Sequence, residues 1–377
     1  MRRSLFVGSV FALAITGASA APPVRAVASP GASPRTPSLT CSGGFVADTT
    51  PNPKKIDILN AAKAFAGSTV WAVGSTAIDA STSVPLAERW NGSSWSSVAV
   101  PPFGSVNNQL SGVAGSSSND VWAVGDEDSA GNPGGLIEHW NGSAWAASTG
   151  SGAGSGFGGV AAITSTNAWA VGSFGLQTFV EHWNGASWSV VASPNGPGGD
   201  GYLAAVSAVS ASNIWAVGAT STSALIEHWN GTKWSVHSSP AITGTSFLSS
   251  VREISASDVW AVGAVESASF VETTLVEHWN GATWTIVASP NGSSSFSDLT
   301  AVAPISATDV WAVGNQSSGA LAMRYNGTVW TLVPELAGHL TLNGATASTT
   351  EHVVWAVGSQ EKSSKPFKTF AEHVCPA

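Results

Sequence analysis

Residues 259–263 read VWAVG and residues 275–284 read LVEHWNGATW, and these two stretches decide the fold because the chain repeats them. The first motif occurs seven times, centred on Trp71, Trp122, Trp169, Trp215, Trp260, Trp311 and Trp355. Five copies of the second motif keep both tryptophans, the sixth keeps only Trp330, and the seventh stops at Cys375. Successive copies are 44 to 51 residues apart, which is the length of one supersecondary unit in a repeat protein.

Each repeat predicts four short strands. In the fifth copy, residues 248–251 (LSSV) begin a first, small-sided strand, and residues 259–263 form a β-branched and aromatic run. Residues 275–279 and 284–287 form two more runs, joined through Asn280-Gly281, a strong hairpin signal because both residues tolerate the positive φ of a type I′ turn. Four antiparallel strands per repeat, without helical periodicity, are typical of one blade of a β-propeller.

Side-chain size supports a radial arrangement of these blades. The first strand of each repeat is small-sided, as in residues 160–163 (VAAI) and 206–209 (VSAV), and such strands suit a crowded axis. The paired tryptophans of the second motif fit the wider outer gaps, where each ring buries roughly 150–250 Å². We therefore predict an all-β fold over residues 41–377: a seven-bladed β-propeller of four-stranded antiparallel blades.

The strand order and content resemble the kelch and galactose-oxidase class of propellers. Those families place a Gly-Gly pair where this chain has Val-Gly, as at Val262-Gly263. The VWAVG and WNGxxW motifs are also similar to those of tectonin-type lectin propellers. The resemblance covers residues 41–377 and implies blade architecture more specifically than membership in any one of these families.

The N-terminal segment is expected to complete the last blade. Residues 45–52 (FVADTTPN) align with residues 284–291 (WTIVASPN), so Phe45 takes the place of a fourth-strand tryptophan. On this alignment Cys41 and Cys375, the two cysteines of the chain, both fall at the turn asparagine. In an oxidising environment a Cys41–Cys375 disulfide is the natural pairing, and two unrelated free thiols are the alternative.

The first forty residues are expected to lie outside the propeller. Residues 1–20 have the charged start, apolar stretch and small-residue cleavage site of a secretory signal peptide, cut after Ala20. Residues 21–40 form a Pro/Ala/Ser-rich leader that cannot bury a core. Without Arg2 and Arg3, 12 basic and 23 acidic residues remain, a net charge of −11. We therefore expect a secreted, extracellular monomer with no membrane span and no nucleic acid partner.

A repeated Glu-His pair is the most conspicuous chemical signal. It occurs at Glu138-His139, Glu181-His182, Glu227-His228, Glu277-His278 and Glu372-His373, with Arg89 and Arg324 at the histidine position elsewhere. A ring of histidines suggests metal ligands or general bases, but arginine suits an ion pair and not a metal site. Because neighbours in a strand point to opposite faces, we expect each Glu to meet the His or Arg of an adjacent blade. The Asp or Asn before each second strand is interpreted as a turn cap (Asp120, Asn167, Asn213, Asp258 and Asp309).

Binding residues are expected where the repeats differ. The loops between second and third strands, and between blades, vary in length and open on one face. Aromatic residues there are the candidate ligand contacts, although they also suit plugs of a propeller mouth: Phe103, Phe157, Phe174, Tyr202, Phe247, Phe270 and Phe296. Asp126, Glu127, Asp128 and Asn132 form a weak calcium candidate, and no other metal or cofactor is expected. Lys63, Arg252 and Glu253 interrupt the small first strands, so they line the axial channel or pair with one another.

Enzyme chemistry finds little support in the residues. Galactose-oxidase-like chemistry needs tyrosines and a cysteine at copper, whereas Tyr202 and Tyr325 are the only tyrosines here. Sialidase-like chemistry needs an arginine cluster, and only Arg89, Arg252 and Arg324 follow the leader. The sequence favours a non-catalytic propeller that recognises an extracellular glycan, cell-wall material or a protein. The alternatives are a glycoside hydrolase or lyase acting through the same loops, and a structural surface protein.

Overall fold

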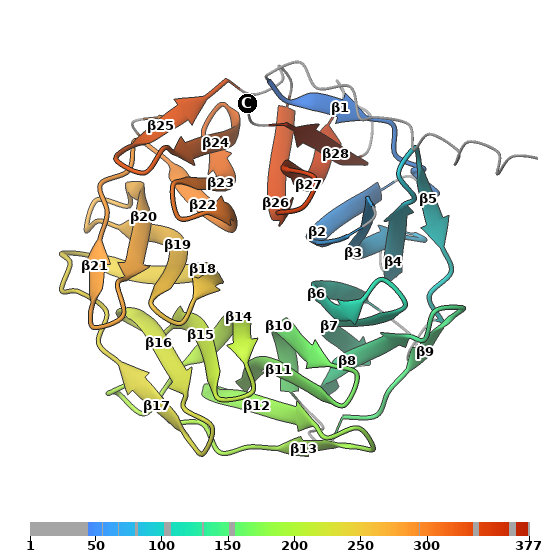
Figure 1. Ribbon diagram of the computed structural model, residues 1–377, viewed down its shortest axis with the longest axis horizontal. Coiled ribbons are helices and arrows are strands. Elements are labelled where there is room, and N and C mark those ends of the chain that lie inside the picture. Colours follow the sequence, from blue (N-terminus) through green and yellow to red (C-terminus); the bar gives the residue numbers. More distant parts are fainter. Residues whose placement is uncertain are drawn as a thin grey trace, which may run out of the picture. The chain divides into compact units, whose positions relative to one another are not determined.

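Seven separate four-stranded antiparallel sheets form the protein, as the repeats predict. The computed structural model describes residues 44–54, 56–66, 68–79, 82–101, 107–129, 132–150, 155–293, 295–334, 339–361 and 367–375, all within one unit, Pro37–Ala377. This part of the chain contains no helix, and hence none that could cross a membrane. Figure 1 shows the seven sheets placed radially around an axis in chain order, so the predicted all-β, seven-bladed propeller is confirmed. The predicted signal peptide and the whole of the predicted leader lie outside the described residues.

Six blades are continuous in sequence, and the chain enters each at its innermost strand and leaves at its outermost. Blades 1 to 3 contain β2 (Ile56–Phe65), β3 (Thr69–Ala77), β4 (Ser83–Trp90), β5 (Trp95–Val98); β6 (Asn108–Ser117), β7 (Asp120–Ser129), β8 (Asn132–Trp140), β9 (Trp145–Ala147); and β10 (Ser155–Thr164), β11 (Asn167–Phe174), β12 (Gln177–Trp183), β13 (Trp188–Val190). Blades 4 to 6 contain β14 (Tyr202–Ser210), β15 (Asn213–Ala219), β16 (Ala224–Trp229), β17 (Trp234–His237); β18 (Thr245–Ser255), β19 (Asp258–Glu266), β20 (Glu272–Trp279), β21 (Trp284–Ile286); and β22 (Ser297–Ser306), β23 (Asp309–Gln316), β24 (Gly319–Tyr325), β25 (Trp330–Val333).

Blade 7 joins the two ends of the described chain. Its inner strands are β26 (His339–Ser348), β27 (Val353–Glu361) and β28 (Lys368–Val374), and β1 (Val46–Asp48) pairs with β28 as the outermost strand. The register places Val46 opposite His373, which is the alignment predicted for the closing strand. Cys41 lies outside the described residues, so its disulfide with Cys375 stays a prediction.

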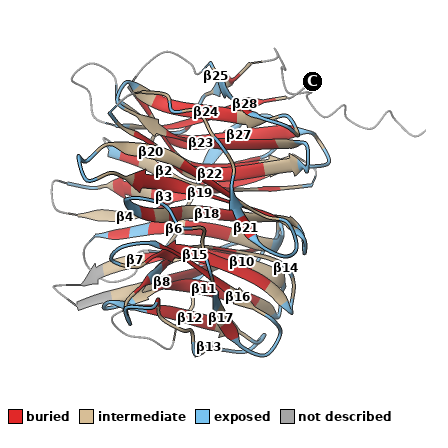
Figure 2. Ribbon diagram, turned by 90° about the vertical axis from the view of Figure 1, so that its left-hand side faces the viewer, coloured by how far each residue is buried: buried red, intermediate tan, exposed pale blue. Residues whose placement is uncertain are grey.

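The VWAVG-type segment of each second strand is apolar because both of its faces are buried (Figure 2). In β19, Val259 and Ala261 pack toward blade 4, whereas Trp260 and Val262 pack toward blade 6. This alternation follows from the two-residue period of a strand, and it uses each face for a different neighbour. The VWAVG motif therefore serves two blade interfaces at once.

The glycine of VWAVG lies opposite a β-bulge in the innermost strand. In blade 5 the register skips from Leu248 to Ser250, so Ser249 is the inserted residue. The bulge brings the carbonyl oxygen of Phe247 to 2.0 Å from the place where a Cβ on Gly263 would lie. The corresponding distance is 1.8 to 2.0 Å in all seven blades, so every blade requires glycine at this position.

Tryptophan clusters hold neighbouring blades together. The ring of Trp169 in β11 lies 4.8 Å from that of Trp229 and 5.7 Å from that of Trp234, both in the next blade. Trp71, Trp122, Trp215, Trp260 and Trp355 make equivalent contacts, with Tyr325 replacing one ring in blade 6. At the closing interface Trp311 meets Phe45 at 5.6 Å. The predicted packing role of these residues is confirmed.

The WNGxxW segment forms a hairpin, as predicted, but its turn is not the predicted type I′ turn. Trp229 pairs directly with Trp234, so four residues form the loop. Only Gly231 has positive φ, at 94°, whereas the Asn230 side chain accepts hydrogen bonds from the amides of Thr232 and Lys233. Asparagine is therefore present for its side-chain oxygen and not for a left-handed backbone.

Candidate functional site

The aromatic residues predicted to form a binding rim separate into exposed, half-buried and core positions. Phe157 is only 2% exposed and packs on Phe179 with ring centroids 5.8 Å apart, so it is a core residue and its prediction as a rim residue was wrong. Phe247 and Phe296 are half-buried, and Phe103 lies outside the described residues. The remaining three are exposed: Phe174 at 49%, Tyr202 at 43% and Phe270 at 82%.

A backbone hydrogen bond joins the chain segments that carry two of the exposed aromatics and a third apolar residue. The amide of Gly201 donates to the carbonyl of Leu176 at 2.9 Å, which joins the turn after Phe174 to the start of β14 at Tyr202. We name Phe174, Leu176 and Tyr202 the rim patch. Leu176, at 81% exposure, was missed in the sequence, although a leucine directly after a turn glycine is an available signal. Phe270 belongs to blade 5, two blades further along.

A shallow groove of about 310 Å³ adjoins the rim patch on blade 3. Phe174, Phe179 and Val190 contribute apolar surface, and Gln177 and Ser193 contribute polar atoms. Such a mixture is typical of small-molecule sites, where apolar walls supply contact area and a few polar groups fix orientation.

The calcium candidate is only partly described. Asp126 accepts a hydrogen bond from Nε2 of Gln109 at 3.4 Å, and burial raises its pKa. The side chains of Asp128 and Asn132 lie outside the described residues. Among the described side chains no group of three or more His, Cys, Asp or Glu could hold a metal, so calcium binding stays a prediction.

The histidines pair within their own blades, so the partner predicted for them was wrong. His139 Nε2 lies 2.7 Å from Asp120 Oδ1, and His228 Nε2 lies 2.7 Å from Asn213 Oδ1. His182 and Asn167, His278 and Asp258, and Arg324 and Asp309 repeat the contact at 3.0, 2.9 and 2.8 Å. Each of these His or Arg side chains also lies over the tryptophan that follows its Asp or Asn partner by two residues. The rings of His139 and Trp122, for example, have centroids 4.1 Å apart. The Asp or Asn taken for a turn cap is thus the partner of the His or Arg.

Blade 7 has Val353 at the aspartate position, and its histidine finds a different partner. Nδ1 of His373 lies 2.8 Å from Oδ2 of Asp48 on the closing strand. His373 is 3% exposed and stacks on Trp355 with centroids 5.0 Å apart. The same residue type that braces other blades internally therefore fastens β1 to β28 here.

The glutamates of the repeated pair do face a neighbouring blade, but they meet hydroxyl groups there. Ser193 Oγ donates to Glu227 at 2.5 Å, and Ser239 Oγ donates to Glu277 at 2.7 Å. Burial raises the pKa of Glu227 to about 8 and that of Glu277 to about 7, with the serine hydrogen bonds acting in the opposite direction. Burial likewise raises the pKa of Glu138 to about 7, and no described group hydrogen-bonds to its carboxyl oxygens.

The serine partners carry a signal that the sequence interpretation missed. Ser193 and Ser239 both precede a proline after the fourth strand, five residues beyond its tryptophan. Blade 1 has Val100 at this position, which leaves Glu138 of blade 2 without a hydroxyl. The Ser-Pro dipeptide of one blade therefore belongs with the glutamate of the next.

The axial channel has a narrow waist lined by the bulges of the seven innermost strands. The waist cavity is about 110 Å³, and it is lined by small and polar residues that include Asn60, Ser249 and Asn343. Asn60 Nδ2 donates to the Leu110 carbonyl at 2.9 Å, and Asn343 Nδ2 donates to the Leu59 carbonyl at 2.9 Å. These bonds link adjacent blades across the channel wall. Some polar side chains at the waist therefore already form hydrogen bonds with the backbone of a neighbouring blade.

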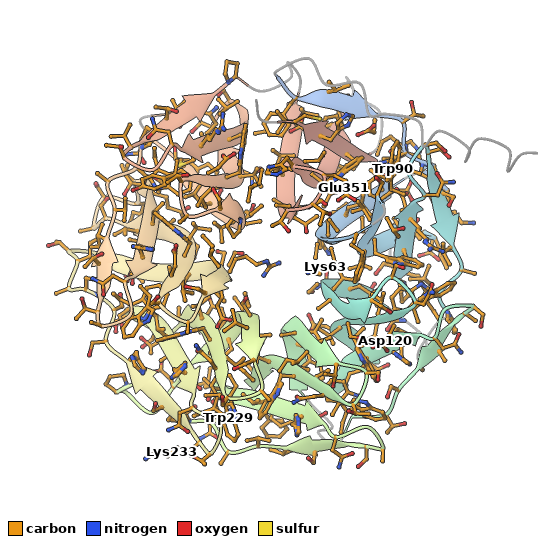
Figure 3. All side chains as sticks on the ribbon, in the orientation of Figure 1. Lys63, Trp90, Asp120, Trp229, Lys233 and Glu351 are labelled. Carbon is orange, nitrogen blue, oxygen red and sulfur yellow. The ribbon has the colours of Figure 1, made fainter. Side chains whose placement is uncertain are left out.

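A wider cavity of about 290 Å³ lies beside the waist, at the end of the channel that carries the short turns between first and second strands. Lys63 and Arg252 line it, together with Glu253, so the prediction that these residues line the channel is confirmed. Figure 3 shows Lys63 beside the central opening, whereas Lys233 lies at the outer rim. Charged side chains at the channel mouth thus occupy positions where the other repeats have uncharged residues.

Comparisons with solved structures confirm the propeller fold. A structure of YCF48 bound to a D1 peptide aligns with a TM-score of 0.59 at 13% identity, covering 91% of this chain and 99% of that chain. YCF48 from Cyanidioschyzon merolae aligns with a TM-score of 0.59 at 14% identity, covering 88% of this chain and 98% of that chain. U3-55K aligns with a TM-score of 0.59 at 13% identity, again over 88% and 98% of the two chains.

No protein-family model and no curated protein matches the sequence. Identities of 13 to 14% in the structural matches establish the fold alone. The chain is therefore a seven-bladed β-propeller, and its resemblance to kelch or tectonin repeats stays a prediction.

Proposed function

We propose that this protein is an exported, non-catalytic recognition protein that binds a carbohydrate, such as a cell-wall glycan, through its variable-loop face. The rim patch is the observation that carries this proposal. Phe174, Leu176 and Tyr202 are exposed on strand ends and a tight turn of adjacent blades, where a rigid scaffold supports them. Exposed aromatic side chains held in fixed positions supply contact area at little cost in conformational entropy.

The polar atoms around the patch suit a hydroxyl-rich ligand. Burial raises the pKa of Tyr202, so its hydroxyl stays protonated and available as a donor. The exposed amide of Gln177 adds a donor and an acceptor in the adjoining groove, whereas the Ser193 hydroxyl is already bonded to Glu227. The signal peptide predicted from residues 1–20 supports an extracellular ligand. A protein that binds the same patch is the alternative ligand.

A binding screen against glycans and polysaccharides tests this function. We expect a ligand whose affinity falls at least about tenfold in the Phe174→Ser/Tyr202→Ser double variant, because both rings lie in the patch. Phe270→Ser is the matched control, since it removes an even more exposed ring that lies in blade 5 and outside the rim patch.

The alternatives have distinct outcomes in the same screen. Release of reducing ends or unsaturated products from a polysaccharide would establish a glycoside hydrolase or lyase instead. An absence of binding to glycans and extracellular proteins alike would favour a structural surface protein.

A further inference from the structure

Two cationic side chains share the cavity at the turn end of the axial channel. Lys63 comes from β2 in blade 1 and Arg252 from β18 in blade 5. The cavity wall between them is made by blades 6 and 7, through residues such as Ala303 and Thr346. The two cations therefore approach one ligand-sized space from separate blades.

No carboxylate neutralises this pair in the described structure. Lys63 forms no ion pair, and its ammonium lies 5.8 Å from the ring centre of Phe65. Arg252 donates from Nη1 to the carbonyl of Val251 at 2.9 Å and forms no ion pair. Glu351 follows Thr350 in the chain but does not line this cavity, and its carboxylate accepts hydrogen bonds from the Thr350 hydroxyl at 2.6 Å and the Ser68 amide at 3.4 Å.

Glu253 also leaves the cations uncompensated. Burial raises its pKa to about 8, and the backbone amides of Val209 and Trp215 offset only part of this rise. Its carboxyl is therefore mainly protonated at neutral pH. Burial, and to a smaller extent the charge of Arg252, lowers the pKa of Lys63 to about 8.

Blade packing does not require cations at these positions. Lys63 and Arg252 are opposite the VWAVG tryptophan in register, as Lys63 is opposite Trp71. The other five blades have small side chains at the equivalent position: Ala114, Ala161, Ser207, Ala303 and Thr346. Two like charges in a shared, partly buried space are unfavourable unless a counterion accompanies them.

We propose that Lys63 and Arg252 bind a small oxyanion, either a phosphate group or the carboxylates of a compact polycarboxylate, in the channel mouth. Arginine presents a planar set of donors that matches an oxyanion, and lysine adds a second charge. The cavity of about 290 Å³ admits a small ligand. This site lies at the channel end away from the rim patch and does not depend on the proposed glycan recognition.

Titration calorimetry of the full exported chain with inorganic phosphate and with citrate tests the site. We expect saturable binding of at least one anion, and a loss of about tenfold or more in affinity for Lys63→Met and for Arg252→Met. Arg252→Lys should recover part of the affinity because it keeps the charge. The anion that binds more tightly distinguishes phosphate from carboxylate chemistry.

Lys233→Met is the matched control, since it removes a lysine from an exposed outer turn. The proposal is overturned if neither anion binds at millimolar concentration, or if Lys233→Met weakens binding as much as Lys63→Met. Melting temperatures of each variant without anion distinguish lost binding from lost folding.

Proton uptake provides a second readout. At pH 8, anion binding should protonate Lys63, and the heat should depend on the ionisation enthalpy of the buffer. Glu253→Gln should keep this uptake and Lys63→Met should remove most of it; the reverse result would contradict a role for the ammonium.

Discussion

The interfaces between blades, which we call the walls, and the mouth of the axial channel are built from the same repeats. They differ in whether their ionisable side chains have partners in the protein. In the walls, buried carboxyl groups recur at one position, and a serine of the preceding blade bonds to Glu227 and to Glu277. In the channel, Lys63 and Arg252 occur in two blades of seven, and no described acid pairs with either.

In a repeat protein, recurring residues and isolated residues call for different explanations. A residue that recurs in most copies has partners supplied by the recurring neighbours, so its role is explained within the scaffold. A charge that appears in isolated copies has no such partner, and its desolvation is unexplained by packing alone. The walls account for the shape, whereas the channel mouth and the rim patch are where a ligand is expected.

The largest effect should come from breaking a wall. Trp260→Ala removes the ring that contacts Tyr325 and Trp330 across the interface between blades 5 and 6. We expect the free energy of unfolding to fall by about 3–5 kcal/mol, measured by urea denaturation. Phe270→Ala, which removes an exposed ring, should change it by less than about 0.5 kcal/mol. Equal effects of the two substitutions would show that the tryptophan clusters do not hold the blades.

The pH dependence of stability tests the buried carboxyls. Their pKa values are raised from 4.5 to about 7 or 8 in the folded state, so the folded protein retains protons that the unfolded chain has released. The free energy of unfolding should therefore decrease as pH rises from about 4.5 to about 8. Glu227→Gln should gain about 1–3 kcal/mol over wild type at pH 8 and little at pH 5.

Two variants sharpen this prediction. Glu361→Gln, at an exposed position, should show no comparable gain at either pH. His228→Gln should act on the acid side, because burial and the nearby His237 lower the pKa of His228 to about 4. Its neutral form stabilises the fold above pH 6.5, and that contribution is lost as pH falls toward 4. Identical melting of wild type and His228→Gln from pH 5 to 8 would contradict the assignment.

A smaller effect is expected at the closing blade. Asp48→Ala removes the partner of the buried His373 and should lower the free energy of unfolding by about 1–2 kcal/mol. Asp258→Ala is the matched control, because its partner His278 is more exposed and water can replace the contact. We expect the control to cost less than about 1 kcal/mol by the same denaturation assay. A larger loss in the control would mean that closure does not depend on this contact.

The smallest effect should come from the channel. In buffer free of phosphate and polycarboxylates, Lys63→Met should leave the free energy of unfolding unchanged or raise it by less than about 1 kcal/mol, since it removes repulsion from Arg252. A clear decrease would place Lys63 with the structural residues of the walls and remove the contrast between the two regions.

Residue patterns predicted the architecture because a propeller repeats its constraints in every blade. Seven glycines such as Gly263 each face a bulge, and paired tryptophans such as Trp229 and Trp234 each flank a hairpin turn, so equivalent positions indicate the same structure in each copy. The closing strand was also predicted, since residues 45–52 keep the sequence pattern of a fourth strand. The alignment also placed Asn52 correctly: it accepts a hydrogen bond from Thr369 as Asn195 does from Thr178.

Contacts between copies were harder to predict. The partner of His139 is Asp120, nineteen positions earlier in the chain, and only the strand register brings the two together. The bond between Ser193 and Glu227 crosses a blade interface, which a single repeat does not reveal. Phe157 was assigned to the rim because its distance from the strand start does not show whether the ring turns inward. Side-chain direction at strand ends thus limited the candidate site more than the fold.

The closing strand has a consequence for the order of folding. β1 emerges from the ribosome before every other described strand, and its partner β28 emerges last. The bond between Asp48 and His373 therefore spans 325 positions, so the ring cannot close until β28 has been synthesised. Until then β1 is an unpaired edge at one end of a growing arc, and blades 1 to 6 can assemble locally while it waits. Truncation near the C-terminus should for this reason leave most blades able to form and the first-made strand without a place to pair.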